Sequence, residues 1–163
     1  MKKFYHKDRI EVGIDEVARG CLAGPVFSAA VIWPHEIDEE YRHMEDMIKD
    51  SKKLSRKRRA VLREFIENFS LDYSVAFVDA EEIDKVNILN ATHNAMHKAI
   101  SNLNIVPDHL LIDGNSFKPY YHNDELIDNT CVIEGDKTYI SIAAASILAK
   151  EYHDDYIKEL CKN

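Results

Sequence analysis

The chain has 163 residues, of which 45% are hydrophobic and 31% are charged, and its formal net charge is −8. This length and composition fit one compact domain with a buried core and exclude a disordered chain. No apolar run approaches the ~20 residues that a membrane-spanning helix needs. The basic segment 1–9 is not followed by an apolar stretch of signal-peptide length, so no secretion signal is expected.

Three cysteines, Cys21, Cys131 and Cys161, share no CxxC spacing. An odd number of unpaired cysteines is typical of free thiols in a reducing compartment rather than of a disulfide framework. We therefore expect a cytoplasmic protein with one domain over residues 1–163, which acts as a monomer and away from membranes.

The acidic net charge argues against a nucleic-acid partner, but it hides a local excess of positive charge. We call residues 49–63 the basic stripe, because this segment holds eight Lys and Arg residues against Asp50 alone. A block of like charge is often a solvated helix face, and it is also what a polyanion-binding surface needs. Charge alone leaves both interpretations open.

The first half of the chain predicts two strands followed by helices. Residues 10–14 form a short extended segment, and the nearly continuous apolar run at 26–33 indicates a buried strand. Apolar residues recur at helical spacing over 37–48. Residues 55–69 predict a longer helix, which Ser55 can cap.

The second half alternates strands and helices. Residues 73–78 predict a strand and residues 88–103 a long amphipathic helix. Two further strands are expected at 109–112 and 130–133, followed by a helix over 139–160. This order indicates an α/β fold with a mixed central β-sheet flanked by helices.

Acidic residues stand where the predicted strands end or the last helix begins. Asp15 and Glu16 follow the first strand, Asp113 follows the strand at 109–112, and Asp136 precedes the last helix. Ligands gather at the carboxyl ends of strands in open α/β sheets, so these side chains can meet if their strands are parallel neighbours. Carboxylates suit Mg²⁺, and two such ions ~4 Å apart can cleave a phosphodiester.

Two arguments weaken this metal-site hypothesis. Asp-Gly is an ordinary turn dipeptide, so each acid taken alone fits a turn residue better than a metal ligand. Neighbouring residues on a strand also point to opposite faces, so Asp15 and Glu16 can share a site only if the strand ends or bulges there. On this ground Asp15 is the better candidate ligand.

Four ordered motifs resemble the type 2 ribonucleases H, the ribonuclease HII family. They are GIDEVARGCLAGPVFSAAVI (13–32), DSKKLS (50–55), LIDGN (111–115) and GDKTYISIAAASILAK (135–150). The segment NILNATHNAMHKAI (87–100) also resembles the central helix of that family. The resemblance covers roughly residues 10–155, in the order and spacing of the family.

The resemblance implies a ribonuclease H-like fold and an endonuclease that hydrolyses RNA in RNA–DNA hybrids or cuts at ribonucleotides embedded in duplex DNA. It implies Mg²⁺ or Mn²⁺ as the cofactor and products with a 3′-hydroxyl and a 5′-phosphate. The catalytic, metal-binding carboxylates of the family fall on Asp15, Glu16, Asp113 and Asp136.

The resemblance also implies substrate contacts outside the acids. The Gly-Arg-Gly motif that reads the ribose 2′-hydroxyl falls on Ala18, Arg19 and Gly20, and the phosphate-contacting loop falls on Ser51, Lys52 and Lys53. Asn115 and Lys150, within the matched motifs, are further substrate-binding candidates.

Some positions depart from the family pattern. Ala18 replaces the first glycine, and its methyl group can block close backbone approach to the ribose. The sequence also stops before the family's HKGYGT-like segment, whose tyrosine packs against a nucleotide sugar, and Tyr152 and Tyr156 stand at the wrong places to replace it. Glu151 and His153 occupy positions where the family usually has an apolar residue and an arginine.

Two rival functions remain open at this point. His93 and His97 have the i, i+4 spacing of a helical zinc site, but Asn94 stands where a zinc hydrolase would carry its glutamate base. Alternatively, the chain is a catalytically weak or inactive module that binds hybrid duplexes without cutting them.

Overall fold

A computed structural model describes residues 1–17, 24–49 and 51–161. Ala18, Arg19, Gly20 and Cys21 lie outside the described residues. The elements follow in the order β1 (Glu11–Val17), β2 (Val26–Ile32), η1 (Glu39–Tyr41), α1 (Arg42–Lys49), η2 (Ser51–Lys53), α2 (Arg56–Phe69), β3 (Asp72–Val78), α3 (Ala80–Ser101), β4 (His109–Asp113), β5 (Tyr121–His122), β6 (Glu125–Leu126), β7 (Asp128–Val132), η3 (Gly135–Lys137) and α4 (Ile140–Cys161).

Five strands form one mixed sheet in the order β3-β2-β1-β4-β7. β2 runs antiparallel to both β1 and β3, whereas β1, β4 and β7 are parallel neighbours. The carboxyl ends of these three strands therefore meet at one edge of the sheet. The predicted mixed sheet is confirmed, and so is the parallel pairing on which the acidic site depended.

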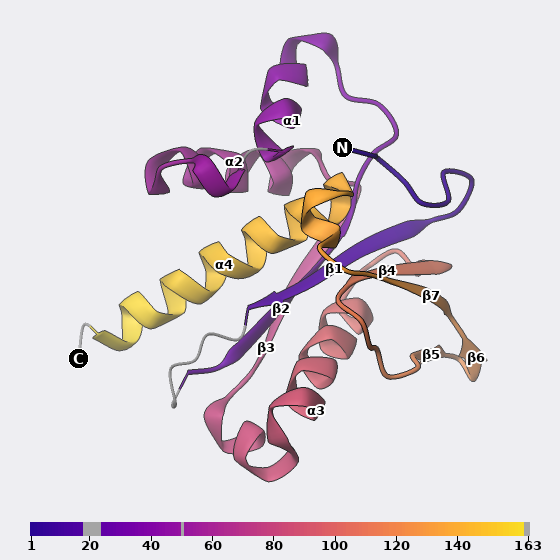
Figure 1. Cartoon of the computed structure of the whole chain (residues 1–163), viewed down its shortest axis with the longest axis vertical. Helices are drawn as coiled ribbons and strands as arrows, with labels where there is room; N and C mark the ends of the chain where they lie inside the picture. The colour runs from indigo at the N-terminus through magenta and orange to yellow at the C-terminus, as the bar shows by residue number, and fades with distance from the viewer. Residues whose placement is uncertain (18–23, 50, 162–163) are drawn as a thin grey trace.

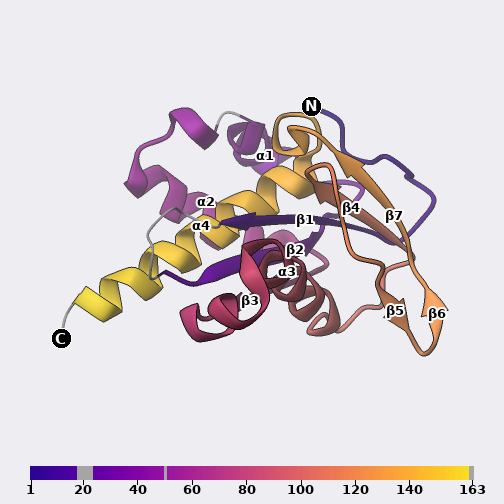
Figure 2. The same cartoon turned by 60° about the horizontal axis from the view of Figure 1, so that its bottom comes forward.

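Helices cover both faces of this sheet (Figures 1 and 2). α4 crosses one face together with α1 and α2, and α3 lies on the other face. The apolar side chains of β1 and β2 alternate between two cores: Ala29 and Val31 pack under α4, and Val12, Ile14 and Ala30 pack under α3. In the described part of the chain, no helix has the length and apolar character to cross a membrane.

α4 approaches β1 very closely at Gly13. A Cβ atom built on Gly13 would lie 2.4 Å from the backbone carbon of Ser141, a distance that real atoms do not reach. The small residues Ala143, Ala144 and Ala145 that follow on α4 are buried. The start of α4 is therefore held directly against the strand that carries Asp15.

α3 begins earlier than the helix predicted over 88–103, because the mostly polar residues before Ile88 are also helical. Asp79 caps the helix by accepting a hydrogen bond from the Glu82 amide at 2.9 Å. Asn87 interrupts the helix with φ 70°, and its side chain accepts a hydrogen bond from the Asn90 amide at 3.0 Å. Asn87 thus acts as a second, internal cap, which explains why the apolar periodicity begins at Ile88.

The β5–β6 hairpin was not predicted. Its two-residue turn places Asn123 and Asp124 at φ 49° and 64°, a conformation that favours Asn and Asp. The strands have two residues each, too few for an alternating pattern to stand out.

Candidate active site

Strand alternation brings Asp15 and Asp113 to the same face of the sheet. Ile14 and Ile112 are register partners across β1 and β4, and both pack in the core under α3. Because consecutive side chains on a strand point to opposite faces, the next residues, Asp15 and Asp113, both face α4. Two neighbouring parallel strands therefore present a carboxylate each at the edge where they end.

Asp136 reaches these two acids from the loop between β7 and α4. Asp113 Oδ1 accepts hydrogen bonds from the Gly135 amide at 2.7 Å and from the Asp136 amide at 3.4 Å. A Cβ atom on Gly135 would lie 3.3 Å from Asp113 Oδ1 and 2.6 Å from Ile142 Cδ1, so only glycine fits without displacement. Asp113 thus fixes the turn that carries Asp136.

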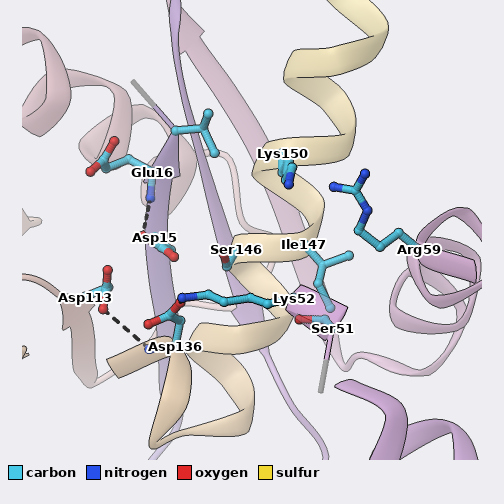
Figure 3. Close-up of a pocket in the computed structure, with 11 residues that line it drawn as sticks. Asp15, Glu16, Ser51, Lys52, Arg59, Asp113, Asp136, Ser146, Ile147 and Lys150 are labelled. Atoms are coloured by element: carbon cyan, nitrogen blue, oxygen red, sulfur yellow. Dashed lines mark hydrogen bonds and ion pairs between the residues drawn. The ribbon is translucent and has the colours of Figure 1, made fainter. Parts of the chain in front are cut away.

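The Glu16 side chain does not point to the same face of the sheet as Asp15, because β1 neither ends nor bulges there. β1 continues through Glu16 to Val17 in regular pairing with β2, with Glu16 opposite Ser28. The expectation that the strand stops before Asp15 is wrong, because β2 extends the ladder. Figure 3 shows the Glu16 carboxylate directed away from Lys52 and Asp136, although Glu16 still lines the edge of the cavity.

All four acids line one cavity of about 340 Å³. Its wall is acidic where β1, β4 and η3 meet and basic where η2, α2 and α4 meet (Figure 3). The residues that line it are Asp15, Glu16, Val17, Ser51, Lys52, Arg59, Asp113, Asp136, Ser146, Ile147 and Lys150.

The acids in this cavity interact strongly with one another. Asp15 is only 5% exposed. Burial raises its pKa well above the ordinary value, and the charge of Asp113 raises the pKa further. Lys52 Nζ lies 2.9 Å from Asp136 Oδ2, and this hydrogen bond raises the pKa of Lys52. A positive charge among these carboxylates is therefore favourable.

The carboxylate oxygens in this cavity are of the type that binds a hard divalent cation, but they are not arranged to hold one in this structure. Among the described residues, no group of three or more His, Cys, Asp and Glu side chains is placed to hold a metal ion together. Lys52 supplies the positive charge at Asp136, and Asp113 Oδ1 is turned toward the Gly135 amide. Carboxylate oxygens are the ligands that Mg²⁺ and Mn²⁺ prefer. The Lys52 ammonium group supplies positive charge at Asp136, as such an ion would.

Comparison with known proteins identifies the family. The sequence profile of ribonuclease HII matches residues 12–163. The chain belongs to the ribonuclease HII family. It is 50% identical over 159 residues to the ribonuclease HII of Phocaeicola vulgatus, a match that covers 98% of this chain and 74% of the relative. It is 52% identical over 155 residues to the ribonuclease HII of Bacteroides fragilis strain ATCC 25285, covering 95% and 72%.

Solved structures share the fold. The ribonuclease H2 of Pyrococcus horikoshii OT3 superposes with a TM-score of 0.78 at 23% identity, covering 94% of this chain and 76% of that one. Bst-RNase HIII in complex with Mn²⁺ superposes with a TM-score of 0.71 at 20% identity, covering 93% and 54%. The ribonuclease H-like fold is thus confirmed, and family membership makes the chain a ribonuclease H endonuclease of a metal-dependent family that acts on RNA–DNA hybrids.

The predicted ribonuclease HII substrate residues that the structure describes lie in three places. Ser51, Lys52 and Lys150 line the acidic cavity. Lys53 lines a smaller adjoining cavity of about 180 Å³ together with Ser51 and Lys52. Asn115 is exposed in the bend after β4 and does not line either cavity.

The basic stripe is partly neutralised by acids of the same chain. Lys49 pairs with Asp46 at 3.0 Å, and Arg56 approaches Asp154 at 4.0 Å. Arg63 pairs with Asp155 and with Glu67. The stripe is therefore not a uniformly available cationic surface.

Arg59 is the charged residue of the cavity that sequence reasoning did not single out. It was counted only as one charge of the basic stripe. A signal was present, because Arg59 lies three and seven residues before Leu62 and Ile66, which are completely buried on α2. Its side chain therefore belongs to the inner face of that helix rather than to the solvent face.

The histidine pair on α3 does not form a zinc site. His97 Nε2 lies 2.8 Å from the Lys118 carbonyl oxygen, and burial lowers the pKa of His97. Both His93 and His97 contact the ring of Phe117. The two rings thus pack against the segment after β4, and no third ligand accompanies them within the described residues.

Proposed function

We propose that this ribonuclease HII hydrolyses a phosphodiester at a ribonucleotide, either in an RNA–DNA hybrid or embedded in duplex DNA, in the cavity formed by Asp15, Asp113 and Asp136. The observation that carries the proposal is the meeting of these carboxylates from β1, β4 and η3 beside Lys52. Glu16, at the edge of the same cavity, is included as the fourth metal ligand.

Mg²⁺ or Mn²⁺ is the proposed cofactor. When bound, two divalent ions would supply an activated water and would stabilise the leaving oxygen of the phosphodiester. Asp15 and Asp113 would hold the ions from adjacent strands, together with Asp136 from η3. The Mn²⁺ complex of Bst-RNase HIII, which shares the fold, supports this choice.

The remaining residues bind and orient the substrate. The water oxygen bonds to phosphorus and gives up a proton, the bond from phosphorus to the O3′ of the upstream nucleotide breaks, and O3′ takes up a proton, which leaves a 3′-hydroxyl and a 5′-phosphate. Lys52, once released from Asp136, binds phosphate with Ser51, Lys53 and Lys150. The three lysines and the Ser51 hydroxyl would hold the strand while the acids act on its backbone.

Ribose recognition is proposed for Ala18, Arg19 and Gly20, with Asn115 as a further contact. The methyl group of Ala18 makes the two substrate classes a real alternative. If backbone approach to the ribose is hindered, cutting at a single embedded ribonucleotide suffers more than cutting of a long hybrid, where many ribonucleotides offer a site.

The test offers both substrates to the wild type and to Asp113→Asn, with Mg²⁺ or Mn²⁺. One substrate is a DNA duplex with one ribonucleotide, and the other is a long RNA–DNA hybrid. We expect cleavage by the wild type and none by Asp113→Asn, with product ends identified by ligation. Binding without cleavage by the wild type would instead identify a hybrid-binding module.

A further inference from the structure

The Arg59 side chain enters the active-site cavity with unused hydrogen-bonding capacity. Its Nε and Nη1 atoms are buried and have no hydrogen-bond partner among the described residues. Figure 3 shows the guanidinium group extending from α2 toward Lys150 of α4. Buried donors without partners cost free energy, so a ligand that satisfies them binds favourably.

The flanking arginines on the same side of α2 are not in this situation. Arg56 lies near Asp154, and Arg63 pairs with Glu67 and Asp155. Arg59 stands between them, and no acid lies within ion-pairing distance of it in the described part of the chain. Its unpaired state is therefore specific to the position that faces the cavity.

Glu151 explains how the charge of Arg59 is tolerated there. Glu151 is only 7% exposed and lies on α4 next to Lys150. Burial raises the pKa of Glu151, and the attraction of Arg59 opposes this rise. Glu151 thus lies close enough to interact with the Arg59 charge, but it forms no hydrogen bond with Arg59 Nε or Nη1.

Building on the proposed function, we propose that Arg59 binds a backbone phosphate of the cut strand next to the scissile one, through Nε and a terminal nitrogen. A guanidinium group matches two phosphate oxygens at once, and the cavity is where the strand must lie. Arg59 thereby sets the position of the strand relative to Asp15, Asp113 and Asp136. Lys52 and Lys150 would hold the neighbouring part of the backbone.

The first test measures binding of a DNA duplex with one ribonucleotide by fluorescence anisotropy at several KCl concentrations. All proteins carry Asp113→Asn, so that the duplex is not cut. We expect Arg59→Ala to bind roughly tenfold more weakly and its salt slope to fall by about 1, as for one lost phosphate contact. Arg59→Lys keeps the charge but loses the two-point contact, so its affinity should lie between that of the parent and that of Arg59→Ala.

The matched control is Arg42→Ala, which removes the same charge from the exposed surface of α1, where Arg42 pairs with Glu39. Its affinity and salt slope should equal those of the parent. Thermal unfolding verifies that every variant folds. If Arg59→Ala does not fold, Arg59→Gln is used in its place. Equal binding by the Arg59 and Arg42 variants would overturn the inference.

The second test identifies the phosphate. Neutral methylphosphonates replace single phosphates on each side of the ribonucleotide, and their effect on binding is measured for the parent and for the Arg59→Ala variant. We expect one position on the cut strand whose neutralisation weakens binding by the parent but not by Arg59→Ala. Additive effects at every position would refute a direct contact. Failure of the wild type to bind or cut any substrate would refute the proposed function itself, which is a distinguishable outcome.

Discussion

Lys52 Nζ lies 2.9 Å from Asp136 Oδ2, at the point where the carboxylates of the active site meet. The hydrogen bond to Asp136 and the charges of Asp136, Asp113 and Asp15 all raise the pKa of Lys52. The lysine thus compensates the negative charge that a divalent cation would otherwise neutralise. The proposed metal binding at Asp136 and the proposed phosphate binding by Lys52 would therefore be coupled, because each requires this ion pair to open.

Replacing Lys52 should strengthen metal binding in the absence of nucleic acid. Lys52 is 67% exposed, so its ion pair is weak, and we expect Lys52→Ala to bind Mn²⁺ roughly two- to fivefold more tightly by isothermal titration calorimetry. The same variant should bind hybrid duplexes more weakly. Lys57→Ala, an exposed member of the basic stripe, is the control, and equal Mn²⁺ affinities for the two variants would contradict the coupling.

Asp15→Asn should stabilise the metal-free protein while abolishing cleavage. A carboxyl group whose pKa is higher in the folded than in the unfolded state stabilises the fold below the unfolded pKa, here 3.8, and this contribution is lost as the pH rises through the folded pKa. At pH 7 the burial of Asp15 therefore disfavours folding, because the raised pKa makes ionisation less favourable in the folded than in the unfolded state. Asparagine retains the acceptor for the Glu16 amide and removes the charge.

We expect the free energy of unfolding of Asp15→Asn to rise by on the order of 1 kcal/mol at pH 7, and this gain to shrink as the pH falls toward 4. Cleavage should fall by roughly a hundredfold or more. Urea unfolding in EDTA at several pH values measures the first effect, with exposed Asp8→Asn as control. A destabilised variant at pH 7 would show that the Asp15 charge is compensated in the folded protein.

Much of the fold follows from sequence patterns that burial imposes directly. β2 is buried along its whole length, so it appears as an unbroken apolar run, and α2 begins at the cap Ser55 as predicted. The segment of α3 before Asn87 escaped prediction because only Ile83 and Val86 contribute apolar contacts there, too few for a helical pattern to stand out. The end of β1 was misplaced because the extended segment was taken to stop at Ile14, before the two acids, whereas pairing with β2 continues the strand to Val17.

Part of the candidate active site was also predictable, because strand register and side-chain alternation follow from sequence patterns. Register and alternation place Asp15 beside Asp113, and both facts follow once β1 and β4 are known to be parallel neighbours. The apolar spacing of α2 places Arg59 on the inner face of that helix, but the cavity that this face lines depends on how α2 packs against α4, which no local pattern specifies. The same is true of the ion pair between Lys52 and Asp136, whose residues lie far apart in the sequence.

Tyr152 links α4 to α2 through its hydroxyl group. It donates a hydrogen bond to Glu67 Oε2 at 2.9 Å, and the Arg63 guanidinium lies 4.1 Å from the centre of its ring. Tyr152→Phe keeps the ring and removes the hydrogen bond, so we expect a loss of about 1 kcal/mol in the free energy of unfolding. The measurement is urea denaturation.

Tyr156→Phe is the matched control for that change. Tyr156 is on the same helix and packs against Phe27 and Phe77, and its hydroxyl forms no hydrogen bond within the described residues. Its replacement should change stability by less than about 0.5 kcal/mol. Equal losses for the two variants would mean that the Glu67 hydrogen bond contributes nothing measurable.

Two glycines near the site should respond differently to a methyl group. On Gly13 the new Cβ atom would lie 2.4 Å from the Ser141 backbone carbon, and on Gly135 it would lie 2.6 Å from the flexible end of Ile142. Backbone cannot move aside as a side-chain terminus can. We therefore expect Gly13→Ala to lose about 3 kcal/mol of stability, and Gly135→Ala considerably less.

The effect of Gly135→Ala should appear in catalysis instead. Its Cβ atom would lie 3.3 Å from Asp113 Oδ1. This oxygen accepts the hydrogen bond from the Gly135 amide and so holds the turn that carries Asp136. A displacement of a few tenths of an ångström there shifts one carboxylate relative to another, so cleavage should fall while most of the protein stays folded at 25 °C. Thermal unfolding and initial cleavage rates of both variants test this separation. A Gly135→Ala enzyme with full activity, or a Gly13→Ala protein as stable as the wild type, would show that the backbone near Asp113 or Gly13 relaxes without cost.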